Sequence, residues 1–304
     1  MKTKILFLLL MSLIGNSVIS SCKKDKTAIA TTAQTVTQYV ESDDNFSILS
    51  QALTKANLAD VLNGPGNFTV FAPNNDAFTA LFKQLGVNGI ADLSAETLAP
   101  ILLYHVLGEE KKASMLSTGY YTTLSPSQGN YLSIYFSSLS GVTVDKDSKV
   151  VQTDVDVKNG VIHVINKVLL PPTVVDQATY NGNFSILVQA VVKAGLAETL
   201  SGPGPFTIFA PTDAAFQALF TQLGVSGISD LTAAQLIPIL KYHVVSGNIR
   251  STQLMEGSVT TLNGTINITL SPSPAINGNT NIVATDVQAS NGVIHVIDKV
   301  LLPK

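Results

Sequence analysis

Residues 68–78, Phe-Thr-Val-Phe-Ala-Pro-Asn-Asn-Asp-Ala-Phe, decide the fold of this chain. The first five residues are types that favour β-strands, and such residues fall on both faces of the strand. This predicts a strand that is covered on both sides. Pro73 ends this strand because proline has no N–H for the sheet ladder. Asn74 or Asn75 is suited to cap the helix that follows. That helix is predicted by apolar residues spaced along one face, namely Phe78, Leu81, Phe82 and Leu85.

A closely similar stretch occurs at residues 206–216, so the chain contains two copies of one repeat unit. Residues 45–106 align without a gap with residues 183–244 at an offset of 138. The match then loosens and recovers at residues 159–165 and 291–297, where the offset is 132. The second copy is therefore six residues shorter in its hairpins, which is the difference between the two offsets.

The repeat predicts two domains, at residues 35–172 and 173–304. The linker is essentially Pro171-Pro172, so the two domains should be held close and semi-rigidly. Residues 92–106 and 230–244 predict a third helix in each copy. Its apolar stripe in the first copy consists of Leu98, Ile101, Leu102 and His105.

The start of the chain has the pattern of a signal peptide over residues 1–21, with early lysines followed by an apolar run. Residues 18–22, Val-Ile-Ser-Ser-Cys, resemble a bacterial lipobox, and Cys22 is the sole cysteine. This resemblance implies that Cys22 carries lipid and begins the mature chain, with residues 22–34 as a flexible tether. A plain secretory signal with a chance cysteine is the alternative. No aspartate follows Cys22, which by analogy with bacterial sorting favours the outer membrane, on its periplasmic or its surface side.

Composition and missing motifs narrow the class of function. The chain has 304 residues, a formal net charge of −3 and one arginine, so a nucleic-acid partner is not expected. A single cysteine excludes an internal disulfide framework. The sequence contains no Gly-x-Ser-x-Gly, no phosphate-binding loop and no His-x-x-x-His. We therefore expect a binding protein without a cofactor and not an enzyme.

Three motifs, in the same order in both copies, resemble the fasciclin (FAS1) family. They are Phe-Thr-Val-Phe-Ala-Pro with the Ala-Phe that follows, Tyr-His-Val at the end of the third helix, and Asn-Gly-Val-Ile-His-Val-Ile near the end of each copy. The resemblance covers nearly all of residues 35–304. It implies an α+β fold with two tandem fasciclin-like domains, each a wedge-shaped β-sandwich with helices along one edge. It also implies an extracellular role in adhesion or matrix attachment.

The four histidines, two in each copy, are the first candidate site: His105, His163, His243 and His295. Their positions among apolar residues favour buried histidines that hold helix to sheet. Tyr-His motifs of animal fasciclin proteins have been linked to integrin binding, and Tyr104-His105 and Tyr242-His243 match them. A direct partner contact there is the alternative. A metal pair is a weaker one, because no acidic residue or cysteine stands at ligand spacing.

An Asp-Val pair precedes the last hairpin of each copy, at Asp154-Val155 and Asp286-Val287. Fasciclin adhesion motifs carry an Asp-Ile pair at this place, and both copies have valine instead. An exposed carboxylate here suits an integrin-type metal site, and it equally suits the closure of a turn. We favour the turn.

The third candidate is a strand on which the two copies differ. Alternation along residues 130–136 places Leu132, Ile134 and Phe136 inside and turns Tyr131, Ser133 and Tyr135 outward. Tyr120 and Tyr121 lie just upstream. Outward tyrosines offer an apolar ring and a hydroxyl to a sugar or to a protein. The alternative is an outer sheet face that the neighbouring domain covers.

These observations predict a non-enzymatic lipoprotein of the cell envelope that mediates adhesion to a surface, to matrix or to neighbouring cells. Its expected partners are a cell-surface or matrix protein or polysaccharide, and the membrane through the lipid on Cys22. The alternative is an accessory glycan- or ligand-binding lipoprotein of a nutrient-uptake system.

Overall fold

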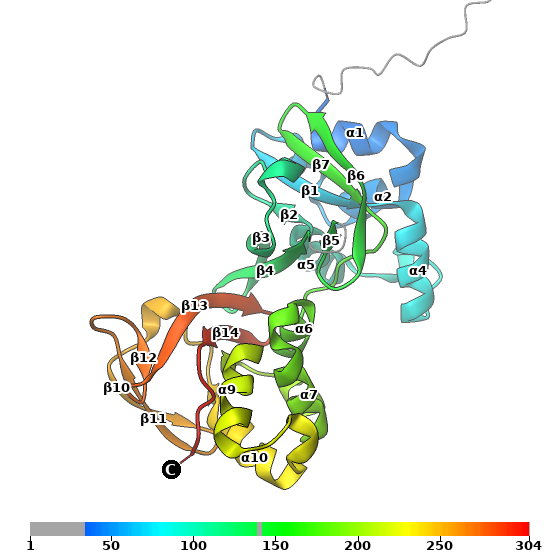
Figure 1. Ribbon diagram of the computed structural model, residues 1–304. Helices are drawn as coiled ribbons and strands as arrows, with labels where there is room; N and C mark the ends of the chain where they lie inside the picture. The colour runs from blue at the N-terminus through cyan, green and yellow to red at the C-terminus, as the bar shows by residue number, and fades with distance from the viewer. Residues whose placement is uncertain (1–33, 139–141, 304) are drawn as a thin grey trace, which may run out of the picture. The chain divides into compact units, whose positions relative to one another are not determined.

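A computed structural model of the protein describes residues 34–138 and 142–303. The helices of the first repeat are α1 (Val36–Ser42), α2 (Ser47–Lys55), α3 (Ala59–Asn63), α4 (Asn75–Leu85) and α5 (Ala95–Tyr104), with short 3-10 turns at Asp44–Phe46, Ile90–Asp92 and Ala113–Met115. Its strands are β1 (Phe68–Pro73), β2 (Val106–Leu107), β3 (Gly119–Ser127), β4 (Asn130–Ser137), β5 (Thr143–Val144), β6 (Ser148–Val157) and β7 (Gly160–Ile165). Figure 1 shows these elements in blue to green.

The second repeat has the same order of elements, in green to red in Figure 1. Its helices are α6 (Val174–Tyr180), α7 (Ser185–Lys193), α8 (Ala197–Ser201), α9 (Asp213–Leu223) and α10 (Ala233–Tyr242), with 3-10 turns at Gly182–Phe184, Ile228–Asp230 and Ser251–Gln253. Its strands are β8 (Phe206–Pro211), β9 (Val244–Ser246), β10 (Gly257–Thr261), β11 (Gly264–Thr269), β12 (Ala275–Ile276), β13 (Thr280–Ala289) and β14 (Gly292–Ile297).

The structure confirms the strand, the stop and the cap predicted at residues 68–78. β1 ends at Pro73, and the side chain of Asn74 accepts a hydrogen bond from the N–H of Ala77, so α4 starts one residue after Asn74. Gly86 ends the helix at a φ of 68°, a left-handed conformation that glycine adopts without strain. Leu85 lies in the helix as predicted, and it is 45% exposed because it lies in the last turn, beyond the core.

The third helix is shorter than the sequence pattern predicts. Residues 90–92 form a 3-10 turn, and α5 starts at Ala95, where the side chain of Ser94 caps it by accepting from Thr97 N at 3.2 Å. At the other end, His105 closes the helix and the chain enters β2 directly.

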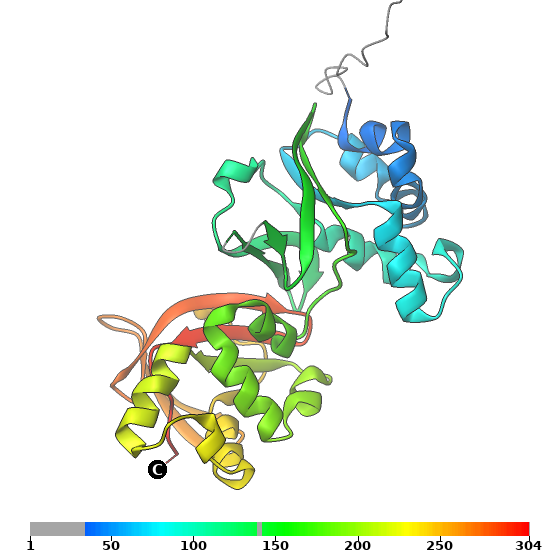
Figure 2. The same cartoon turned by 45° about the vertical axis from the view of Figure 1, so that its right-hand side comes forward.

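β1 is covered on both faces, as predicted. Val70 and Ala72 face the core under the helices, which includes Leu49. Phe71 faces a second core, which β3 to β5 line with residues such as Leu132. Figure 2 shows the helices of the first repeat grouped on one side of β1 and β7. Each repeat therefore has two apolar cores, one on either side of its central strands.

The strands of each repeat join into one continuous set of paired strands. β1 lies between β2, antiparallel, and β7, parallel. In the first repeat β1 to β7 close into a barrel, and in the second the order is β10-β11-β12-β13-β14-β8-β9. The two sheets of the expected sandwich are thus connected at their strands. Glycine is required where β7 starts, because a Cβ on Gly160 would lie 2.0 Å from the carbonyl oxygen of Phe68.

The apolar core of the second repeat is packed less fully than that of the first. An apolar cavity of about 40 Å³ lies between α6, α7 and β8, and its counterpart in the first repeat measures about 10 Å³. Two smaller side chains explain the difference, because Ala178 and Val191 stand where the first repeat has Val40 and Leu53.

Ala178→Val is therefore expected to stabilise the protein by about 1 kcal/mol. Each added methyl contributes about 0.8 kcal/mol when it is buried, and valine in place of alanine costs a helix roughly 0.6 kcal/mol. Urea unfolding measures the gain. Ala190→Val is the matched control, since the first repeat keeps alanine there, at Ala52, and overpacking destabilises. Equal destabilisation by both substitutions would contradict the prediction.

Candidate functional site

His105 and His243 tie the third helix of each repeat to the last segment of that repeat. Nε2 of His105 accepts from Leu169 N at 2.9 Å, so its Nδ1 carries the proton and donates to the carbonyl of Ile101 at 2.8 Å. His243 makes the same two bonds in the second repeat, each 2.8 Å long. Burial lowers the pKa of both imidazoles to about 4, so both rings are neutral at pH 7.

The two Tyr-His pairs are internal. Tyr104 and His105 are buried, and so are Tyr242 and His243. The Tyr242 hydroxyl donates to the carbonyl of Thr265 at 2.8 Å. This burial contradicts a direct partner contact through these pairs and agrees with the favoured interpretation, in which they hold helix to sheet.

His163 and His295 join the last hairpin of each repeat to the loop that follows the third helix. Nδ1 of His163 accepts from Asp154 N at 3.2 Å, and its Nε2 donates to the carbonyl of Lys111 at 2.9 Å. His295 makes the corresponding bonds, at 3.4 and 2.8 Å. Burial lowers the pKa of both rings, which are therefore neutral structural groups at pH 7.

The aspartates of the two Asp-Val pairs, Asp154 and Asp286, close this same loop. Asp154 has a φ of 56° at an irregularity in β6, and its carboxylate accepts from Ala113 N at 2.8 Å. Asp286 accepts from Ser251 N at 2.8 Å and from the Ser251 hydroxyl. The carboxylates hold a neighbouring loop, which agrees with the favoured structural interpretation. Val155 and Val287, expected to be partner-facing, are buried, so this part of the prediction is wrong.

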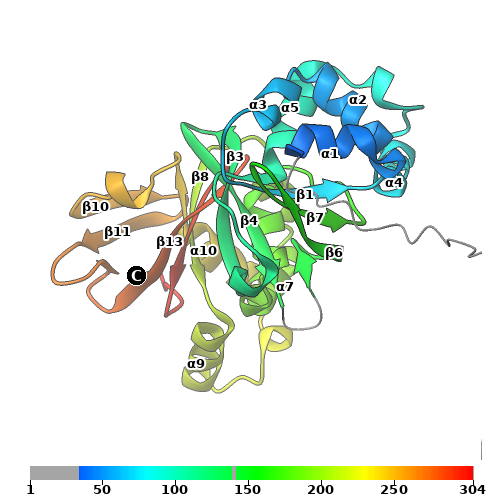
Figure 3. The same ribbon diagram turned by 90° about the horizontal axis from the view of Figure 1, so that it is seen from above.

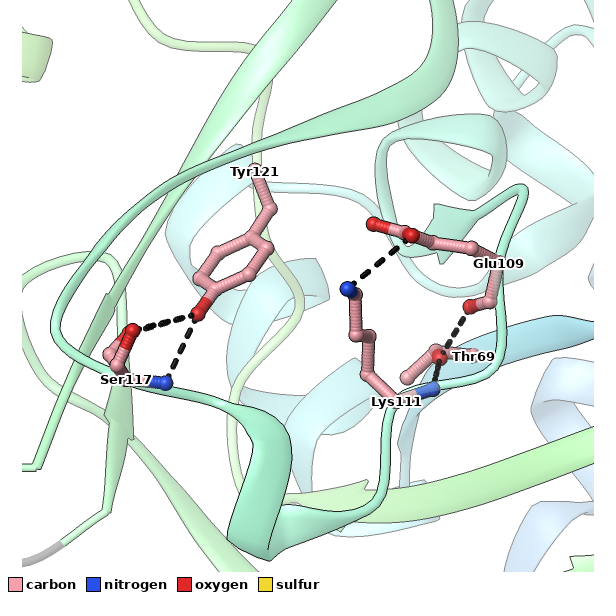
Figure 4. A network of polar contacts seen from close by, with 5 residues as sticks. All are labelled: Thr69, Glu109, Lys111, Ser117 and Tyr121. Atoms are coloured by element: carbon pink, nitrogen blue, oxygen red, sulfur yellow. Dashed lines mark hydrogen bonds and ion pairs between the residues drawn. The ribbon is translucent and has the colours of Figure 1, made fainter.

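Tyr121 and Thr69 hold the two ends of the same loop in the first repeat. Figure 4 shows the Tyr121 hydroxyl directed at Ser117, whose N–H donates to it at 2.8 Å. The Thr69 hydroxyl donates to the carbonyl of Glu109 at 2.6 Å and accepts from Lys111 N at 2.8 Å. The Tyr121 hydroxyl is thus engaged within its own domain, through hydrogen bonds at an exposed position.

The outward face of β4 is covered by the second repeat at Ser133, in the middle of the strand. The Ser133 hydroxyl accepts from Gln288 N at 2.9 Å, and the Ser133 carbonyl accepts from Nε2 of Gln177. The Tyr120 hydroxyl donates to the carbonyl of Gln177 at 3.0 Å, and the Tyr120 ring packs on the core of the second repeat. The described residues of both repeats fall within one compact unit, and Figure 3 shows β4 beside β13.

This contact corrects the prediction of an outward tyrosine surface. Tyr135 is only 5% exposed and lies against Tyr120, with ring centroids 4.9 Å apart, whereas Tyr131 is 50% exposed. The alternative of a face covered by the neighbouring domain is therefore the one that the structure supports. The counterpart strand β11 keeps Thr265 and Asn267 exposed. The two copies differ here because only one of the two faces receives a domain.

Sequence reasoning missed Asp145, a buried carboxyl group that follows β5. It is 6% exposed and has a φ of 53°. Its oxygens accept from the hydroxyl of Tyr104 at 3.2 Å and from Tyr135 N at 3.1 Å. Burial raises its pKa to about 7. The second repeat has Asn277 there, at a φ of 51°, and this difference between the copies was the signal.

The described residues hold no group of three or more His, Cys, Asp or Glu side chains that is arranged to bind a metal ion. Within the same ranges, no helix has both the length and the apolar character needed to cross a membrane. Cys22 and the predicted signal peptide lie outside the described residues.

The chain belongs to the fasciclin family. The fasciclin domain profile matches residues 44–171 and 182–303. The loop-closing histidines and the parallel β1–β7 and β8–β14 pairs lie inside these matches, whereas α1 and α6 lie just outside them. The structure also resembles a FAS1 domain pair from the insect cell adhesion molecule fasciclin I, with a TM-score of 0.50 and 20% identity over 88% of this chain and 96% of that one. This likeness supports the fold alone.

Relatives are found in bacteria and in animals. Protein sll1483 of Synechocystis is 43% identical over 43% of this chain and 73% of its own length. Human periostin is 30% identical over 81% of this chain, and the pig transforming growth factor-beta-induced protein ig-h3 is 31% identical over 80%. The chain spans about a third of the length of these two animal proteins, 29% and 35% respectively.

Proposed function

We propose that this chain is a lipoprotein of the bacterial cell envelope, tethered through Cys22, whose two fasciclin domains attach the cell to a surface or to matrix. The observation that carries the proposal is the pair of fasciclin domains behind a lipobox-like start. Fasciclin I, which shares the domain-pair fold, is described as a cell adhesion molecule.

The use of the polar residues in the structure supports a binding role over a catalytic one. All four histidines, Asp154 and Asp286 hold loops and helices in place through hydrogen bonds to the backbone. These polar groups thus serve to position the backbone of the two domains. The contact between the repeats also fixes two domains on one anchor, which suits weak contacts made together.

Attachment of cells that express the full chain tests the proposal. A strain without the chain, a strain with the wild-type chain and a strain with Cys22→Ser are washed under flow over surfaces coated with isolated matrix polymer or with a confluent layer of cells. The wild-type chain is expected to raise the attached fraction about tenfold, because two tethered sites act together. Cys22→Ser is expected to release the protein from the membrane and to lose that gain.

Equal attachment of the strains with and without the chain would contradict the adhesion function. Retention of the Cys22→Ser chain in the membrane fraction would contradict the lipid anchor. Uptake of a soluble glycan that depends on the chain, without any change in attachment, would instead favour the nutrient-uptake alternative.

A further inference from the structure

A groove of about 450 Å³ runs across the second repeat. It is bordered by α9, by the turn at residues 277–280 and by the last segment of the chain, residues 299–302. Its volume lies in the range of small-ligand sites, roughly 300–1,000 Å³. The lining combines apolar side chains with amides, a hydroxyl and one ammonium group, that of Lys299.

The first repeat has the same residue types at the corresponding positions, with two exceptions that matter. Both repeats carry Ala, Ala, Leu and Gln on the helix and Lys-Val-Leu-Leu in the last segment. The exceptions are two acids of the first repeat, Asp145 and Asp147, which become Asn277 and Asn279 in the second. The copies therefore differ in charge at otherwise equivalent places.

This difference leaves the lysine of the second repeat unpaired. In the first repeat Lys167 forms an ion pair with Asp147. In the second repeat no ion pair or hydrogen bond joins the Lys299 side chain to another described residue. The nearest acid in sequence, Asp298, uses its two oxygens to accept from the backbone and side-chain nitrogens of Asn281, at 2.8 and 2.7 Å.

We propose that this groove binds an acidic polysaccharide, with the ammonium group of Lys299 on a carboxylate or sulfate of the sugar. The side-chain amides of Gln222 and Asn279 both donate and accept, as vicinal sugar hydroxyls do. Leu302, which is 40% exposed, supplies an apolar surface for a pyranose ring. The proposal deepens the adhesion function proposed above and rests on it, because it names the matrix polymer by its chemistry.

A polysaccharide fits the groove better than an acidic protein segment does. One recurring way to capture a peptide is to add it as a strand to a free sheet edge. The strand that reaches the groove, β13, which starts at Thr280, is paired on both sides, by β12 and by β14, so it offers no edge. Recognition must therefore come from side chains, and four of the five polar ones are uncharged: Gln222, Asn277, Asn279 and Thr280.

Titration of the purified full chain with four probes tests the proposal, with binding followed by the NMR resonances of residues 277–280 and 299–302. The probes are a galacturonic-acid oligosaccharide, a sulfated dextran oligosaccharide, a neutral dextran oligosaccharide and an oligoglutamate peptide. The uronic-acid or the sulfated probe is expected to shift these resonances, and the pair of acidic probes distinguishes a carboxylate ligand from a sulfate one. The neutral oligosaccharide is expected to bind at least about tenfold more weakly.

Asn279→Asp is the decisive substitution, because it restores in the second repeat the ion pair of the first. It is expected to weaken binding of the acidic probe about tenfold. Asp147→Asn is the matched reverse, which frees Lys167 and is expected to create a second site in the first repeat. Thermal unfolding of both variants shows whether they are folded, and Lys299→Gln serves as an independent loss of the ammonium group.

Three results would overturn the proposal: unchanged binding by both Asn279→Asp and Lys299→Gln, no binding of either acidic oligosaccharide, or binding of oligoglutamate as tight as that of the sugars. The cell assay separates this inference from the adhesion function. If cells with Asn279→Asp attach normally to acidic matrix, the groove is not the binding site, and the adhesion function is unaffected. If the wild-type chain binds the probe but the cells attach to no surface, the adhesion function is rejected and the ligand site in the groove is retained.

Discussion

Asp145→Asn is expected to stabilise the protein by about 4 kcal/mol above pH 7. The carboxyl group has a pKa of about 7 in the fold, because burial disfavours its charged form. In the unfolded chain the pKa of an aspartate is about 3.9. The folded state therefore holds a proton that the unfolded state releases, and stability falls as the pH rises from about 4 to about 7. At about 1.4 kcal/mol per unit, that loss is the gain expected from asparagine.

The second repeat shows that asparagine fits this position. Oδ1 of Asn277 accepts from Asn267 N at 2.9 Å, which matches the bond from Tyr135 N to Asp145. Nδ2 of Asn277 donates to the hydroxyl of Tyr242 at 3.3 Å. An amide can thus make both hydrogen bonds of the carboxyl group without a charge to bury.

Urea unfolding of the wild type and of Asp145→Asn between pH 4 and pH 8.5 measures this effect. The two curves are expected to coincide near pH 4 and to separate steadily up to pH 7. Asn277→Asp is the comparison in the second repeat, where the position is only half-buried, so it should introduce a smaller loss at high pH. A constant difference between wild type and Asp145→Asn at every pH would show that the carboxyl group does not titrate as inferred.

Much of the fold could be predicted from the sequence because its signals are local. The proline stop and the asparagine cap at residues 68–78 act through neighbouring backbone groups, so the sequence alone places β1 and α4. The repeat then extends that prediction to residues 206–216. Local periodicity predicts that Leu85 lies in the helix but not that it is exposed, because helical spacing does not tell where the core ends.

The site predictions failed where the outcome depends on a distant partner. Alternation along β4 correctly separates Leu132 from Ser133, but it cannot show that Gln177 and Gln288 cover the outer face. Val155 looks exposed beside an acidic residue, yet it is buried in the core under the helices, while Asp154 holds a loop that is far away in sequence. The differences between the copies marked the right places, and only the structure showed what each difference does.

Acid is expected to destabilise the protein strongly between pH 6.5 and pH 4, through His105 and His243. Each imidazole has a pKa of about 4 in the fold and about 6.5 in the unfolded chain. Their stabilising contribution is complete above pH 6.5 and is lost as the pH falls through 4, because the unfolded chain takes up the protons first. The loss is about 3 kcal/mol for each histidine, and about 6 kcal/mol for both.

The hydrogen bonds explain why protonation is opposed. Nε2 of His105 accepts from the backbone of Leu169, and a protonated ring would turn a second N–H toward that N–H. Burial leaves no water to take its place. The ¹³C shifts of the imidazole rings measure the titration directly in the folded protein. A midpoint near 6.5 for either His105 or His243 would contradict the inferred burial of a neutral ring.

Asp145 opposes the two histidines, and this gives their joint pH dependence a sharper test. Between about pH 6.5 and pH 4 the histidines cost stability on acidification, while protonation of Asp145 in the fold returns part of it. These three groups give a net slope of about 1.4 kcal/mol per pH unit in the wild type, and about twice that in Asp145→Asn. His163 and His295, whose pKa values burial also lowers, steepen both curves alike. Asp145→Asn should therefore be the more stable protein at pH 8 and should lose stability faster in acid. Equal slopes of unfolding free energy against pH below about 6.5 for the two proteins would refute this coupling.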